Sequence, residues 1–163
     1  MQSNRRPRVL FVASEVHPFA RTGGLADVAS SLPKALSRMG YEIAVSLPFY
    51  GRESFPSGLT VERLVDVDVV MGEETRRGSI YLSRLDGQIP VLLVSQEAYF
   101  DRKGLYGDES GDYPDNAERF AFFCRAILSG VKRLGWKPGI VHCNDWQTAL
   151  IPLYLKTLYS DDH

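Results

Sequence analysis

A cation, a double glycine and two carboxylates lie close together near the start of the chain. The segment reads Glu15-Val-His-Pro-Phe-Ala-Arg21-Thr-Gly23-Gly24-Leu-Ala-Asp27. Two glycines let backbone amides approach an anion closely, and a helix that begins after them favours negative charge at its N-terminus. Arg21 adds a permanent cation suited to a phosphate. The spacing is neither GxGxxG nor GxxxxGK[ST], so the segment predicts an anion site that is neither an NAD fingerprint nor a P-loop.

The same glycine segment also has a structural interpretation. The glycines could serve only to let a strand and a helix pack closely, and Asp27 could serve only to favour the dipole of the first helical turn. The residue types alone support both interpretations equally.

Two later segments carry further candidate residues. Asp145 follows a short apolar run and either binds a ligand or caps the next helix, which is worth about 1 kcal/mol. His142 is either a binding residue or an ordinary hydrogen-bonded histidine. The stretch Tyr99–Pro114 is rich in Gly, Asp and Tyr, and loops of about fifteen residues are usually functional or mobile. The loop aromatics could stack on a sugar or anchor this loop to the body; they are Tyr99, Phe100, Tyr106 and Tyr113. No metal-binding spacing such as HExxH is present, so no metal site is predicted.

The elements that must position these residues alternate between strand and helix. Val9–Ala13 is a continuous apolar run, which is typical of a buried parallel strand. Leu25–Met39 has helical apolar spacing, with Gly40 as its stop and a kink or an irregular first half expected from Pro33. With a second strand at Glu42–Leu47, these form a right-handed βαβ unit.

The rest of the chain completes an α/β pattern. The further predicted elements are a hairpin of Leu59–Met71 and Gly78–Leu85 with its turn at Gly72–Arg77, a strand at Val91–Val94, a helix at Asp115–Leu134 with a capping box of Asp115 and Glu118, a strand at Ile140–Cys143, and a helix at Asp145–Leu158. The pattern predicts a Rossmann-like, doubly wound, mostly parallel sheet with a β-hairpin insertion, forming one domain over residues 1–163. Ligands bind outside the carboxyl ends of such strands, where Ser14–Leu25, Tyr99–Pro114 and His142–Gln147 fall.

Composition excludes several other classes of protein. The 163 residues suit one domain, and the net charge is −1 with Lys and Arg scattered, so no nucleic-acid face is expected. No apolar stretch reaches the length of a membrane span, so no membrane partner is expected. Cys124 and Cys143 lie in apolar contexts without a CxxC pair, which favours reduced thiols of a cytoplasmic protein.

Four motifs resemble those of bacterial glycogen synthases and plant starch synthases, in the family's order and over nearly the whole chain. They are Glu15-x-x-Pro18-Phe19-x-Arg21-Thr-Gly-Gly-Leu-Ala-Asp27-Val, Tyr99-Phe-Asp101-Arg102-x-Gly104-Leu-Tyr106-Gly107, Asp115-Asn116-x-Glu118-Arg119-Phe120 and Val141-His142-Cys-Asn144-Asp145-Trp146-Gln147. The family usually has lysine where this chain has Arg21, and histidine where it has Asn144.

The resemblance implies the N-terminal half of a two-domain glycosyltransferase fold. The implied enzyme transfers glucose from ADP-glucose to the non-reducing end of an α-1,4-glucan such as glycogen, with retention of configuration and without a metal or other cofactor. The missing C-terminal nucleotide-binding domain would act in cis or in trans, and the chain alone is expected to be inactive. Alternatives are a non-catalytic module that binds a phosphosugar or a glucan, and a partner-dependent subunit. The donor's base, ADP or UDP, stays open.

The resemblance also implies roles for individual residues. Arg21, Gly23 and Gly24 would stabilise charge on the departing diphosphate, and Asp27 and Asp145 would orient sugar hydroxyls. The other substrate-binding candidates are Glu15, His142 and Tyr99. No catalytic general base is identified.

Overall fold

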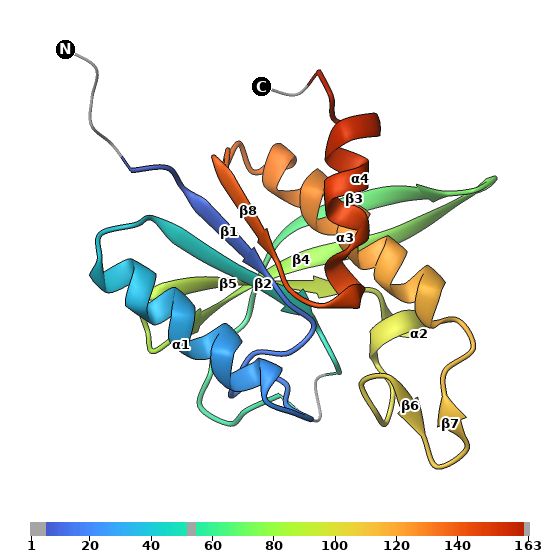
Figure 1. Cartoon of the computed structure of the whole chain (residues 1–163). Helices are drawn as coiled ribbons and strands as arrows, with labels where there is room; N and C mark the ends of the chain where they lie inside the picture. The colour runs from blue at the N-terminus through green and yellow to red at the C-terminus, as the bar shows by residue number, and fades with distance from the viewer. Residues whose placement is uncertain (1–5, 52–54, 162–163) are drawn as a thin grey trace.

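The computed structural model describes residues 6–51 and 55–161, and its core is one six-stranded sheet (Figure 1). The strands are β1 (Val9–Val12), β2 (Ile43–Pro48), β3 (Glu62–Met71), β4 (Glu74–Leu85), β5 (Ile89–Ser95) and β8 (Ile140–Cys143), with a small separate pair of β6 (Gly107–Asp108) and β7 (Gly111–Asp112). The helices are α1 (Leu25–Arg38), α2 (Glu97–Phe100), α3 (Asn116–Arg133), the 3₁₀ helix η1 (Trp146–Thr148) and α4 (Leu150–Thr157).

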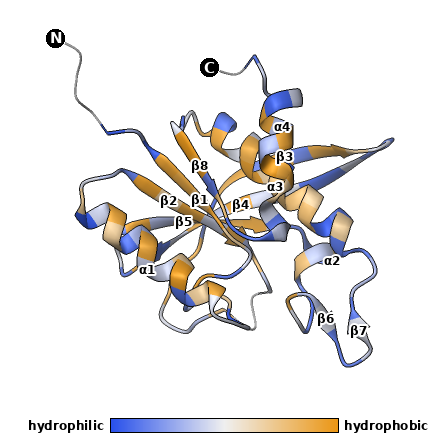
Figure 2. Cartoon of the chain, viewed as in Figure 1, coloured by the Kyte–Doolittle hydropathy of each residue, from blue (hydrophilic) through white to orange (hydrophobic). Residues whose placement is uncertain are grey.

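The sheet confirms the predicted doubly wound architecture. Its order is β3-β4-β5-β2-β1-β8, and β5, β2, β1 and β8 are parallel to their neighbours in this set. Helices α1 and α3 both pack on β2 and β5, so they must cover opposite faces of the sheet. Strands β1, β2 and β5 are therefore buried on both sides, which explains why they read as continuous apolar runs (Figure 2). The edge strand β8 is partly exposed.

The hairpin differs from its prediction in two respects. Its turn is only two residues long, because Glu74 already pairs with Met71, whereas the sequence predicted a turn over Gly72–Arg77. The hairpin also extends the main sheet, because β4 pairs antiparallel with β5. Residues 74–77 are exposed where the hairpin projects from the body (Figure 1). Their polar side chains therefore give this part of the strand the composition of a turn.

Helix α1 has the predicted end but no interruption. Gly40 has φ +85°, and the Tyr41 amide donates to the Leu36 carbonyl, which is the hydrogen bond of a glycine-terminated helix. The helix is continuous through Pro33, which is buried, so the expected irregular first half is wrong.

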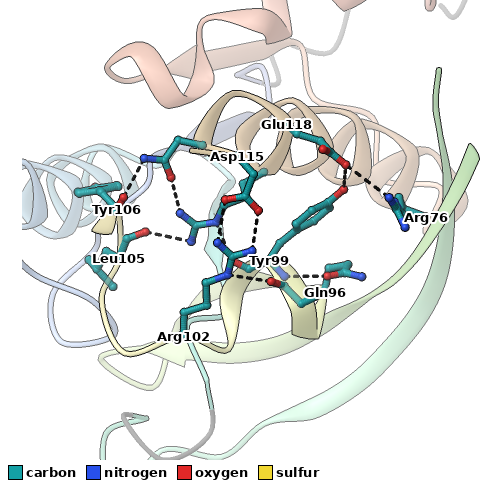
Figure 3. A network of polar contacts seen from close by, with 11 residues as sticks. Arg76, Gln96, Tyr99, Arg102, Leu105, Tyr106, Asp115 and Glu118 are labelled. Carbon is teal, nitrogen blue, oxygen red and sulfur yellow. Dashed lines mark hydrogen bonds and ion pairs between the residues drawn. The ribbon is translucent and has the colours of Figure 1, made fainter. Parts of the chain in front are cut away.

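The predicted capping box of α3 is wrong. Asp115 makes no capping hydrogen bond, because both of its carboxylate oxygens accept from Arg102, at 2.8 and 2.6 Å (Figure 3). Glu118 accepts from the Tyr99 hydroxyl instead of the helix backbone. A charged guanidinium is a stronger donor than a backbone amide, so the Asp115 carboxylate binds Arg102 and does not bind the helix amides.

The last predicted helix is divided. Asp145 has φ 64°, after which the short helix η1 and then α4 follow. Both cysteines are free, with Cys124 buried and Cys143 half-buried. Within the described residues, no helix is both long and apolar enough to cross a membrane.

A tight contact between α3 and the hairpin gives a first prediction. A Cβ atom at Gly130 would lie 2.7 Å from Cγ1 of Ile80, so alanine must displace the hairpin. Overpacking costs about 1–3 kcal/mol, and the better helix propensity of alanine returns about 1 kcal/mol. We expect Gly130→Ala to lower the free energy of unfolding by about 1 kcal/mol, measured by urea denaturation. Gly23→Ala, where a Cβ meets nothing within 4 Å, is the control, and an equal loss in both variants would contradict this explanation.

Candidate functional site

The three segments predicted to share the carboxyl edge of the sheet do meet there. The Tyr106 hydroxyl lies 2.8 Å from a Glu15 carboxylate oxygen, and the Tyr106 ring lies 6.4 Å from the Trp146 ring. The side-chain amide of Asn144 donates to the carbonyl of Val12 at the end of β1, at 2.9 Å. This edge therefore joins the glycine segment, the loop before α3 and the segment after β8.

Glu15 organises the glycine segment from within. It is only 4% exposed, and its carboxylate accepts the amide and hydroxyl of Thr22, both at 2.6 Å, the Gly23 amide at 3.1 Å and the Tyr106 hydroxyl. Burial opposes ionisation of Glu15, but the hydrogen bonds from Thr22, Tyr106 and Gly23 outweigh it and hold its pKa below the usual value. The carboxylate of Glu15 thus occupies part of the anion site that the sequence predicted for a ligand.

The outer side of the glycine segment is open. A Cβ atom at Gly23 or Gly24 would meet nothing within 4 Å, and Gly24 has an ordinary φ of −71°. Neither close packing nor backbone conformation within the described chain requires glycine at these positions, which argues against the purely structural interpretation. The absence of side chains there leaves space in front of the N-terminus of α1.

Arg21 and Asp27 lie at this open side and pair with each other. Their side chains are 56% and 53% exposed, and Nη2 of Arg21 lies 2.9 Å from Oδ2 of Asp27. An exposed pair of this kind is worth about 0–1 kcal/mol, so a phosphate that offers a stronger contact can displace Asp27 from Arg21.

Asp145 combines both roles that the sequence left open. Its carboxylate accepts from the Trp146 amide at 2.7 Å, so it does cap the short helix η1. Its backbone, however, has φ 64° and ψ 177°, a conformation that is essentially restricted to glycine and costs about 1–3 kcal/mol. Strain of this kind clusters at functional sites, and the Asp145 side chain is exposed at the carboxyl edge.

His142 lies in β8 and has a defined orientation. Its ring stacks on Phe11 at 4.8 Å, and its Nδ1 lies 3.2 Å from the side-chain nitrogen of Asn144. Because the amide nitrogen can only donate, Nδ1 accepts and the proton of neutral His142 lies on Nε2.

Tyr99 is separated from the other candidates. It is 5% exposed, its ring packs 5.4 Å from Phe122, and its hydroxyl donates to Glu118. Burial, together with the bond to Glu118, raises the pKa of Tyr99 to about 12. These contacts favour the interpretation that Tyr99 anchors its loop.

The sequence suggested Tyr106 only as a ring that stacks on a sugar or anchors its loop, and it did not indicate Thr22, although both side chains bind Glu15. The available signal for Tyr106 was its position in the motif Gly104-Leu-Tyr106-Gly107. Among the described residues, no group of three or more His, Cys, Asp or Glu side chains gathers closely enough to hold a metal ion.

Comparison with known proteins identifies the family. The family model described as the starch synthase catalytic domain matches residues 8–163. The chain belongs to the starch synthase catalytic domain family. The predicted family and fold are therefore confirmed.

Relatives of this starch synthase domain include bacterial glycogen synthases. The chain is 49% identical to glycogen synthase of Geotalea daltonii and to glycogen synthase 2 of Geobacter sulfurreducens. Each match covers 95% of this chain and 32% of the relative. It thus spans about a third of the length of the curated relatives that it matches. The catalytic domain of starch synthase IV from Arabidopsis thaliana, bound to ADP and acarbose, matches with a TM-score of 0.83 and 30% identity over 95% of this chain and 31% of that chain.

Proposed function

We propose that this chain is the N-terminal domain of a glycogen synthase that transfers glucose from ADP-glucose to the non-reducing end of an α-1,4-glucan. The observation that carries the proposal is the open glycine turn with Arg21 at the carboxyl edge of the sheet, the edge at which Asp145 also lies. The relatives are named glycogen synthases, and the similar starch synthase structure holds ADP and acarbose. The C-terminal domain would complete the enzyme in cis or in trans, in the cytoplasm.

The residues of this domain would act on the departing diphosphate and on the sugars. In the reaction, the bond between the anomeric carbon of glucose and the diphosphate oxygen breaks, and a bond from that carbon to the acceptor 4-hydroxyl oxygen forms. The proton of the hydroxyl passes to the departing diphosphate or to water. Negative charge then develops on the diphosphate, where Arg21 and the first amides of α1 stabilise it. Asp145 and Asp27 would accept hydrogen bonds from sugar hydroxyls, and Nε2 of His142 would donate one.

Glu15 has a different role in this proposal. Its carboxylate is enclosed by protein donors, so it supports the shape of the glycine turn and does not contact the substrate. None of these groups is assigned as a general base.

Arg21 and Asp27 give the experiment that tests the proposal. In a version that includes the C-terminal domain, we expect Arg21→Ala to weaken ADP-glucose binding about tenfold or more. A hydrogen bond to a charged group is worth about 1.5–3 kcal/mol, and 1.4 kcal/mol is a factor of ten. Arg21→Lys should retain most binding, because it keeps the cation. Melting temperatures should hardly change, since the Arg21–Asp27 pair is exposed.

Asp27→Asn distinguishes the role of Asp27 from that of Arg21. It frees Arg21, so ADP should bind more tightly, whereas ADP-glucose should lose affinity if Asp27 orients the sugar. Calorimetric titration of both ligands measures the difference. Unchanged ADP-glucose affinity in Arg21→Ala, with the domain folded, would reject the proposed diphosphate contact.

A further inference from the structure

Helix α3 carries a buried cation with three directed hydrogen bonds. Arg119 has 0% exposure, and its Nε donates to the Tyr99 carbonyl at 2.7 Å. Its Nη2 donates to the Leu105 carbonyl at 3.0 Å, and its Nη1 donates to the side-chain oxygen of Asn116. In the described part of the chain, no carboxylate forms an ion pair with Arg119, because the adjacent Asp115 is held by Arg102 (Figure 3).

Burying a charged guanidinium costs free energy that filling the same space with an apolar side chain would not. Burial lowers the pKa of Arg119, which reflects the penalty on its charged form. The rings of Phe100, Tyr113 and Phe120 lie 5.5, 4.9 and 5.4 Å from the guanidinium carbon and compensate in part. An apolar side chain would fill the same space without desolvating a charge. The distinctive contribution of Arg119 is therefore its set of directed bonds to the loop.

Those bonds fix the chain on the N-terminal side of Tyr106. Tyr99 lies in α2, before the loop, and Leu105 immediately precedes Tyr106. Asn116, which Arg119 also contacts, donates from its side-chain nitrogen to the Tyr106 carbonyl at 2.8 Å. Arg119 and Asn116 thus hold the backbone carbonyls of Leu105 and Tyr106, from which the Tyr106 side chain extends.

Tyr106 connects this loop to the glycine turn. Its hydroxyl donates to Glu15 at 2.8 Å, so the Ser14 hydroxyl, also at 2.8 Å, must be the donor in its contact with Tyr106. Glu15 in turn holds the amides of Thr22 and Gly23. A continuous series of contacts therefore runs from α3 to the segment that carries Arg21.

We propose that Arg119 is a positioning residue for the glycine turn, acting through the loop before α3, Tyr106 and Glu15. The importance of this turn for the donor sugar nucleotide rests on the proposed function. The positioning itself rests only on the geometry.

The test measures the ionisation of Glu15 directly, without any nucleotide. The carboxyl ¹³C resonance of Glu15 is titrated with pH in the 163-residue chain and in Arg119→Met. Loss of the Tyr106 hydrogen bond removes a stabiliser of the carboxylate, so the Glu15 pKa should shift upward in Arg119→Met. Tyr106→Phe removes the same bond directly and should give a shift of the same sign. The double variant should shift the Glu15 pKa little more than either single variant does, because both substitutions remove the same Tyr106–Glu15 hydrogen bond.

Matched variants keep the proposal falsifiable. Arg119→Lys retains the charge without the guanidinium fork and should give a smaller upward shift. Asn116→Ala removes the link to the Tyr106 carbonyl together with the acceptor of Nη1 of Arg119, while the other two Arg119 bonds remain. It should also shift the Glu15 pKa upward, and it tests the proposal if Arg119→Met does not fold. Arg125→Met changes a second arginine of α3, whose guanidinium contacts Val70 and Tyr154, and should leave the Glu15 pKa unchanged.

Two outcomes separate this proposal from the proposed function. Folded Arg119→Met or Asn116→Ala with the Glu15 titration of the parent would overturn the positioning role. A shifted Glu15 titration with unchanged ADP-glucose affinity in the extended enzyme would support positioning and contradict a donor site at the glycine turn.

Discussion

The 163-residue chain by itself is expected to transfer no measurable glucose from ADP-glucose to glycogen. It spans 32% of the length of two glycogen synthases to which it is 49% identical, and the outer side of the glycine turn is open. An open site leaves the diphosphate in water, where its contacts with Arg21 are weak because solvent and salt screen them. Preorganised charge stabilisation requires a site from which water is excluded.

Incorporation of radiolabelled glucose into glycogen measures this expectation. The same chain extended by the remainder of a synthase is the positive control, and the chain carrying Arg21→Ala is the negative control. Turnover by the 163-residue chain near the typical enzyme range of about 1–1,000 per second would show that no further domain is needed.

Glu15→Gln is expected to have the largest effect on stability of any single change at the site. Glutamine keeps one acceptor oxygen but places an amide NH₂ against donors that now bind the carboxylate, namely the Thr22 amide and hydroxyl, the Gly23 amide and the Tyr106 hydroxyl. Hydrogen bonds to a charged group are worth about 1.5–3 kcal/mol, and buried donors left without partners add to the loss. We expect the free energy of unfolding to fall by about 3 kcal/mol at pH 7.

The pH dependence of this loss follows from the depressed pKa of Glu15. A carboxyl group whose pKa is lower in the folded chain stabilises it above the unfolded pKa of about 4.3, and that contribution disappears as pH falls through the folded value. The difference in stability between the parent and Glu15→Gln should therefore be full at neutral pH and should shrink on acidification below about pH 4.

Urea denaturation at several pH values provides the measurement. Glu109→Gln is the matched control, because the Glu109 side chain is 89% exposed and contacts only an exposed lysine in the described ion pair. Its effect should stay within about 1 kcal/mol. A difference between the parent and Glu15→Gln that does not change with pH would contradict the role assigned to the Glu15 carboxylate.

The sequence predicted the architecture well because apolar periodicity determines which faces are buried. The runs at β1, β2 and β5 are continuous because these strands are buried on both faces of the sheet, whereas the edge strand β8 is partly exposed. The parallel order then requires the segments after β1, β5 and β8 to meet at one edge, without knowledge of any side-chain contact.

Side-chain pairing was less predictable because it depends on distant residues. Asp115 was predicted to cap α3, but Arg102 reaches it from thirteen residues away and binds both carboxylate oxygens. The ring of Tyr106 lies over the site because its hydroxyl meets Glu15, 91 residues earlier in the chain. Local patterns contain no information about contacts of this range.

The glycine segment shows the same limit at the site itself. Its two glycines and Arg21 correctly pointed to exposed groups at the carboxyl edge. The sequence did not indicate that Glu15 would take the amides of Thr22 and Gly23, because a carboxylate seven residues earlier can face either solvent or its own backbone. Because Glu15 takes the amides of Thr22 and Gly23, the anion contacts that stay predicted are those of Arg21 and the first turn of α1.

The most direct test of the donor site is a ¹H–¹⁵N NMR titration of the 163-residue chain with ADP. The proposal predicts that the largest amide shift changes occur from Arg21 to Val28, with smaller ones near Asp145, and that Arg21→Ala abolishes them. A separate cavity of about 650 Å³, lined by Arg63, Arg77 and other residues, lies between the hairpin and the ends of β2 and β5. Shift changes centred on that cavity, or unaffected by Arg21→Ala, would contradict a diphosphate site at the glycine turn.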